Sequence, residues 1–197
     1  MPYDGGNSRS EDLKKMLTQA KYFIKDLRRM LGKHKIRILH IWISRVYCGI
    51  FLYRFERGLY TTIGRPYEYF RVIFLPLINL LQAYSNLDIN YKADIKGGLL
   101  VLHPSVGCVI SGRAIVGENL TLTGGNIIGG RAGCKKGGIV IGNNCSMGAN
   151  AVVLGPLTLG NNIEVSAQAL VVNDCRDHNC LLLGVPAKAI GKLGTVN

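Results

Sequence analysis

An apolar residue returns at every sixth position through most of the C-terminal half of this chain. The series runs Ile89, Ile95 and Val101, then Ile110, Val116, Leu122 and Ile128, then Ile141, Met147, Val153, Leu159, Val165 and Val171. A period of six fits neither a helix nor an ordinary sheet, but it fits a β-helix whose short strands stack coil upon coil. We therefore expect one apolar residue of each hexad to fill the bore, with glycine or asparagine at the corners.

The hexad period is broken twice. The first break, between Val101 and Ile110, adds three residues to a hexad and contains His103. The second break contains residues 129–138, a glycine-rich basic segment, and adds one residue to two hexads. Because loops that leave a rigid scaffold commonly carry function, we expect the chemistry of this protein near these two breaks.

The N-terminal part of the chain has a helical pattern of apolar residues. The helices are expected at residues 13–31, at about 36–56, and from Pro66 to a kink or stop near Pro76, with Ser10 as the first N-cap. We therefore divide the chain into an α-helical region, residues 1–87, and a solenoid, residues 88–197. The helical region carries 15 Lys/Arg against 6 Asp/Glu, and the solenoid 9 against 6, so most of the net charge of +12 lies outside the solenoid.

Apolar helices need a partner to cover them. No uninterrupted run of about twenty apolar residues is present, so a membrane-spanning helix is not expected. Two alternatives remain open, namely an oligomerisation region and a basic, amphipathic attachment to a membrane surface. Nucleic acid is not expected as a partner, because the basic residues are dispersed among apolar ones without a binding motif.

The cysteines indicate a reducing compartment. The six cysteines form no CxxC pair and no zinc-type spacing, and Cys108 and Cys145 are expected to be small wall residues of the solenoid. The first residues show no secretory signal pattern. We expect a cytoplasmic protein, with a peripheral position at the inner membrane face left open.

The segment from Asp88 to Lys192 resembles a known family. The strings that carry the resemblance are HPSVGCVISGRAIVGENLTL, IIGG, IGNNCSMGANAVVLGPLTLG and GVPAKAIGK. They resemble the serine acetyltransferase branch of the hexapeptide-repeat acyltransferases. The resemblance implies a left-handed parallel β-helix, transfer of an acetyl group from acetyl-CoA to a hydroxyl, and a homotrimer with its sites between subunits. A dimer of trimers through the N-terminal helices is a further option.

Acyl transfer to a hydroxyl needs a base with a pKa near neutrality, which favours histidine. His103 matches the catalytic histidine of the family, whereas we expect His34, His40 and His178 to be structural or solvated. Asp88 lies fifteen residues earlier, at the offset of the family's Asp–His dyad and about one coil away. A carboxylate at that position would orient the imidazole.

One further carboxylate and the family's coenzyme A contacts complete the expected site. Asp94 is the competing partner for the imidazole, although a solvated corner residue is the better interpretation of it. By resemblance, the contacts to coenzyme A fall on Gly130, Ala149, Ala167, Lys188 and Lys192. Lys135 and Lys136 in the second break are candidate additions.

The acceptor is where the chain departs from the serine acetyltransferases. Those enzymes have an aspartate before the catalytic histidine and an Arg-His pair in the long loop, whereas this chain has Leu102 and Lys135-Lys136. We therefore expect a sugar hydroxyl as acceptor, in surface polysaccharide biosynthesis. The alternatives are a serine O-acetyltransferase of cysteine biosynthesis and a silent or metal-binding β-helix. No metal is expected, because only His103 and His178 lie in the solenoid.

Overall fold

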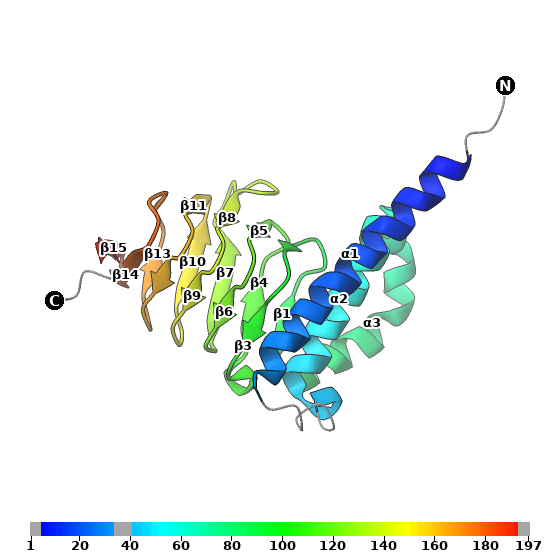
Figure 1. Cartoon of the computed structure of the whole chain (residues 1–197), viewed down its shortest axis with the longest axis horizontal. Helices are drawn as coiled ribbons and strands as arrows, with labels where there is room; N and C mark the ends of the chain where they lie inside the picture. Colours follow the sequence, from blue (N-terminus) through cyan, green and yellow to red (C-terminus); the bar gives the residue numbers. More distant parts are fainter. Residues whose placement is uncertain (1–4, 34–40, 193–197) are drawn as a thin grey trace.

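The computed structural model describes residues 5–33 and 41–192. A layer of helices stands at one end of a parallel β-solenoid, and the last described strand lies at the opposite end (Figure 1). The helical elements of this described part are α1 (Gly5–Leu31), a 3₁₀ turn (Ile41–Ile43), α2 (Arg45–Ile63) and α3 (Pro66–Ser85). Helix α2 lies between the other two and packs against both of them.

The observed helix boundaries correct several expectations. Helix α1 begins at Gly5 rather than after Ser10, and it ends where Gly32 adopts a left-handed φ of +56°. Helix α2 begins only at Arg45, after Ser44, whose hydroxyl accepts a hydrogen bond from the Tyr47 amide. Residues 34–40 of the expected second helix lie outside the described residues. Helix α3 begins at Pro66 as expected but runs through Pro76 to Ser85 instead of stopping there.

The solenoid is a three-sided prism, and each described side is one sheet. Sheet A consists of β1 (Leu87–Ile89), β4 (Cys108–Ile110), β7 (Asn126–Gly130), β10 (Val152–Gly155) and β13 (Leu170–Val171). Sheet B consists of β2 (Asp94–Ile95), β5 (Ala114–Val116), β8 (Ile139–Ile141) and β11 (Leu157–Leu159). Sheet C consists of β3 (Leu100–Val101), β6 (Thr121–Leu122), β9 (Ser146–Met147), β12 (Glu164–Val165), β14 (Cys180–Gly184) and β15 (Ala187–Lys192). All neighbours pair in parallel except β14 and β15.

The apolar hexad residues fill the bore as predicted. The side chains of the periodic series are buried, and Cys108 and Cys145 are buried wall residues. At the corner between sheets B and C, asparagines with left-handed backbone stack side chain to side chain from coil to coil. The members of this ladder are Asn119, Asn144, Asn162 and Asn179. The local geometry therefore agrees with the interpretation of the repeat.

Helix α2 closes the first coil of the solenoid. Ile50 and Tyr53 belong to the same buried cluster as the bore residues, and the Tyr53 hydroxyl donates to the Ala93 carbonyl at 3.0 Å. Gly49 permits the close approach, because a Cβ there would lie 2.8 Å from Leu87. The expected division after residue 87 falls inside β1, so the buried core crosses it.

A buried ion pair also joins the helices to the first coil. Arg54 on α2 donates to Asp26 on α1 at 2.8 Å, and both side chains are fully or almost fully buried. Arg54 also donates to the carbonyls of Ile95 and Lys96, at 2.6 and 2.9 Å. In the described residues, no helix is both long and apolar enough to cross a membrane.

Candidate active site

Each coil turns from sheet C into sheet A at one edge of the prism, which we call the C–A corner. Its segments are residues 102–107, 123–125, 148–151 and 166–169, and the hairpin turn from β14 to β15 follows at the same end of sheet C. Backbone hydrogen bonds join the successive segments, from Gly125 to Gly107 at 2.7 Å, from Asn150 to Gly124 at 2.9 Å, and from Gln168 to Ala149 at 2.8 Å. The corner is therefore a continuous, rigid line of backbone along the solenoid.

His103 lies at the first segment of this corner. The excursion predicted from the hexad break forms a 3₁₀ turn, Pro104–Val106, directly after His103. The His103 amide donates to the Thr123 carbonyl at 2.9 Å, so its backbone is fixed on the next coil. Its side chain is exposed and makes no hydrogen bond within the described structure. Gly124 is needed beneath it, because a Cβ there would lie 2.6 Å from the His103 carbonyl oxygen.

Asp88 lies on β1 with its side chain on the outer face of sheet A. It lines a cavity of about 470 Å³ together with Val106 and Gly107 of the His103 excursion. Asn86 ties the two segments together, since its side-chain amide donates to the Ser105 carbonyl at 3.3 Å. The fold therefore brings Asp88 and the His103 excursion to the same edge of the solenoid. Their two side chains form no hydrogen bond or ion pair with each other in the described structure.

The residues predicted to contact coenzyme A fall into two groups. Ala149 and Ala167 lie on the C–A corner, two and three coils beyond His103, and Ala167 is exposed. Lys188 is exposed on β15, just after the turn that continues this corner. Gly130 lies at the end of β7, at the opposite edge of sheet A. Lys192 ends β15, and its side chain lies outside the described residues.

The second hexad break is a loop at the edge between sheets A and B (Figure 1). Arg131 is bound to the solenoid, since its guanidinium donates to the Val172 carbonyl at 3.1 Å. Cys134 is buried beneath the loop, whereas Lys135 and Lys136 are exposed. These lysines do not lie at the C–A corner of the same chain.

The remaining candidates have structural partners. Asp94 lies on β2 rather than at a corner, and its carboxylate pairs with Arg57 at 3.2 Å. The Nδ1 atom of His178 accepts a hydrogen bond from the Asn161 amide at 2.8 Å, as expected for a structural histidine. His34 and His40 lie outside the described residues. Within residues 5–33 and 41–192, no group of three potential metal ligands converges.

Sequence reasoning missed Asn126, which occupies the second inward position of β7, two residues before the hexad residue Ile128. Its side chain is buried, accepts from the Gly124 amide at 2.9 Å, and donates to the Gly148 carbonyl at 2.7 Å. It therefore braces two segments of the C–A corner from inside the bore. Asn126 pairs with the wall residue Cys108, and a polar residue at the position equivalent to Cys108 was the signal that could have identified it.

Solved structures of known proteins share this arrangement of helices and solenoid. A serine acetyltransferase of Neisseria gonorrhoeae is 26% identical, with 89% of this chain and 67% of that chain covered and a TM-score of 0.73. A Brucella abortus serine acetyltransferase in complex with coenzyme A is 22% identical, with 95% and 73% covered and a TM-score of 0.71. Soybean serine acetyltransferase complexed with serine is 23% identical, with 88% and 70% covered and a TM-score of 0.70. The chain matches no protein-family model, and no curated protein matches it.

By its architecture this chain has the fold of the hexapeptide-repeat β-helix class, which its solved neighbours share. Within that class it has the serine acetyltransferase fold, with N-terminal helices followed by a parallel β-solenoid. The fold class and the resemblance derived from the sequence are thereby confirmed. The narrower assignment to a polysaccharide branch stays a prediction.

Proposed function

We propose that this protein is an O-acetyltransferase that moves an acetyl group from acetyl-CoA to a hydroxyl. The observation that carries this proposal is the C–A corner, which places His103 in line with Ala149 and Ala167 on one rigid edge. Backbone groups at such corners suit an extended donor such as a pantetheine arm. The coenzyme A held by the Brucella abortus neighbour supports acetyl-CoA as the donor substrate.

In this proposal His103 acts as the general base. Its imidazole takes the proton of the acceptor hydroxyl while the hydroxyl oxygen attacks the acetyl carbonyl carbon. The carbon–sulfur bond then breaks, the proton passes to the departing sulfur, and an acetyl ester and free coenzyme A result. The exposed imidazole is accessible for this role, and its backbone is held by the Thr123 carbonyl.

Asp88 is proposed as a positioning residue for that imidazole. It reaches the same edge through Asn86 and lines the cavity next to the His103 excursion. Gly130, Ala149, Ala167, Lys188 and Lys192 are proposed as donor contacts. Because Gly130 lies at the other edge of sheet A, its contribution fits a site formed between neighbouring subunits of a homotrimer.

The acceptor has two candidates. The solved neighbours favour L-serine, because they are serine acetyltransferases and one of them holds serine. They support this alternative better than the sugar hydroxyl expected from the sequence. A sugar acceptor in surface polysaccharide biosynthesis is supported by Leu102, an apolar residue directly before His103.

The N-terminal helices are proposed to mediate assembly of trimers or contact with a membrane surface. Helix α3 exposes many apolar side chains, including Tyr69, Phe70, Val72, Ile73, Phe74, Leu77 and Leu80. Another trimer or a membrane surface would cover this apolar face. Both alternatives agree with a cytoplasmic protein, and the membrane alternative places it at the inner membrane face. Light scattering of the full chain, with and without anionic lipid vesicles, separates the two.

An acceptor screen tests the proposed activity. Release of the coenzyme A thiol is followed with acetyl-CoA and, in parallel, L-serine, free sugars, nucleotide sugars and polysaccharide fragments. We expect acceptor-dependent thiol release with at least one hydroxyl compound. Absence of such release from all of them, in a preparation shown by calorimetry to bind acetyl-CoA, would contradict the proposal.

A further inference from the structure

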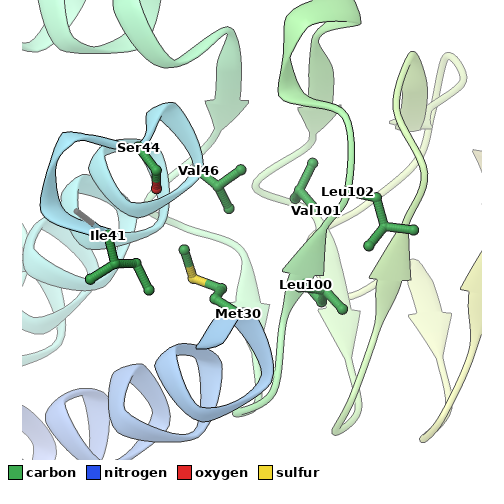
Figure 2. Close-up of a pocket in the computed structure, with 7 residues that line it drawn as sticks. All are labelled: Met30, Ile41, Ser44, Val46, Leu100, Val101 and Leu102. Atoms are coloured by element: carbon green, nitrogen blue, oxygen red, sulfur yellow. The ribbon is translucent and has the colours of Figure 1, made fainter. Parts of the chain in front are cut away.

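A second cavity lies between the helices and the solenoid, beside the candidate base. Its volume is about 340 Å³, in the range of small-molecule sites. The end of α1, the start of α2 and strand β3 form its walls (Figure 2). The apolar side chains that line it include Met30, Ile41, Val46, Leu100 and Leu102.

None of the described residues that line the cavity is charged. Among these lining residues Ser44 alone has a polar side chain, and its hydroxyl accepts a hydrogen bond from the Tyr47 amide at the start of α2. Arg29 precedes Met30, but its guanidinium is bound to Thr121 at 2.9 Å and to the Gly98 carbonyl. A zwitterion such as an amino acid would lose hydration here without gaining a counter-charge, whereas an aliphatic group would gain free energy by burial.

The position of Leu102 connects this cavity to the candidate chemistry. Val101 is buried in the bore, so Leu102 lies on the outer side of the solenoid and is 50% exposed. Its amide donates to the Leu122 carbonyl at 2.9 Å, so its backbone is fixed. His103 is the next residue. A molecule that presents a hydroxyl to the His103 imidazole can therefore place its remaining part against Leu102.

We propose that this cavity binds an aliphatic chain of the acceptor, so that the hydroxyl acetylated here belongs to a glycoside with an attached alkyl or lipid group. The inference rests on the proposed acyl transfer and names its substrate class. The sugar hydroxyl faces the C–A corner, while the chain lies between α1, α2 and β3. The cavity then selects acceptors by their apolar part and His103 acts on the polar part.

Two glycosides that differ only in the aglycone test the proposal. The probes are n-octyl β-D-glucoside, used below its micelle-forming concentration, and methyl β-D-glucoside. We expect calorimetry to show at least about tenfold tighter binding of the octyl glycoside, from burial of a few methylene groups. We expect the same preference in kcat/KM for thiol release if glucose hydroxyls are acetylated.

Variants localise this preference to the cavity. Leu102→Gln and Met30→Gln keep a similar side-chain length but place an amide in the wall, and each should reduce octyl binding several-fold. Ile115→Gln is the matched control, because Ile115 on β5 is 42% exposed and lies outside both the cavity and the helical region. It should leave octyl binding unchanged. If Met30→Gln lowers the melting temperature, Leu102→Gln alone tests the proposal, because the Leu102 side chain is half-exposed.

The outcomes separate this inference from the proposed function. Equal binding of the two glycosides, or octyl binding that Leu102→Gln and Ile115→Gln affect alike, would overturn the inference. L-serine acetylation together with equal glycoside binding would overturn it and leave acyl transfer intact. Cavity-dependent octyl binding without thiol release from any acceptor would instead contradict the proposed function and leave the cavity assignment standing.

Discussion

The buried ion pair between Asp26 and Arg54 stabilises the packing of the helices against the first coil of the solenoid. The Asp26 side chain is 0% exposed, and it also accepts hydrogen bonds from the Gly98 and Leu99 amides at 2.6 and 2.7 Å. Arg54→Leu would leave this carboxylate buried without its cation. Removing one partner of a buried pair costs about 3–5 kcal/mol, so we expect the free energy of unfolding to fall by that amount near neutral pH.

The loss should depend on pH. Burial raises the pKa of Asp26 above its ordinary value, against the lowering effect of the Arg54 guanidinium. In Arg54→Leu that lowering effect is gone, so the pKa in the folded variant rises further. The folded variant then holds a proton that the unfolded chain has released, and its stability increases as the pH falls. The difference in stability from the parent protein should therefore narrow as the pH falls from neutrality towards the ordinary carboxyl pKa of 3.8.

Urea denaturation followed by far-UV circular dichroism measures both effects. Lys25→Leu is the control, because Lys25 on α1 pairs at 2.9 Å with Glu118 of the solenoid and both side chains are nearly half exposed. Such a pair contributes little to stability, because solvent screens it. If Arg54→Leu loses no more stability than Lys25→Leu, or if its loss is the same across this pH range, the reasoning about the buried pair is wrong.

Two further predictions concern the candidate site. Asp88→Asn should lower turnover by less than His103→Ala does. The double variant should lose little more turnover than His103→Ala alone, because residues that act as one unit are non-additive. Fully multiplicative losses in thiol release would show that Asp88 does not act through His103. Ala167→Glu should weaken acetyl-CoA binding in calorimetry at least about tenfold, since a carboxylate on the C–A corner repels phosphates. Binding as tight as in the exposed control Ala83→Glu would exclude Ala167 from the donor site.

The repeat was readable in the sequence because each coil buries its own hexad residues against the next. Every apolar residue of the series carries its own structural signal, so the bore and its breaks followed from spacing alone. The helix boundaries were predicted less accurately from the sequence. Pro76 is tolerated inside α3, which is a largely exposed helix, and Ser44 rather than an upstream residue caps α2. Local propensity does not determine such boundaries.

The site was partly predictable for the same reason. His103 and Asp88 were identified from the family resemblance, supported by a hexad break and an offset of about one coil, and the fold brings their segments to one edge. The cavity beside Leu102 was not predictable, because Met30 approaches β3 only when α1 packs against the first coil. Contacts between a helix and a coil more than sixty residues apart leave no periodic trace in either segment.

The central claim is that His103 is the base for acetyl transfer to a hydroxyl, and turnover of His103→Ala tests it most directly. Thiol release is measured with the best acceptor of the screen, beside calorimetric binding of acetyl-CoA and a thermal melt of the same preparation. We predict a fall in turnover by a factor of about 10² to 10⁴ with acetyl-CoA affinity and melting temperature nearly unchanged. Near-normal turnover in a folded His103→Ala variant would contradict the account.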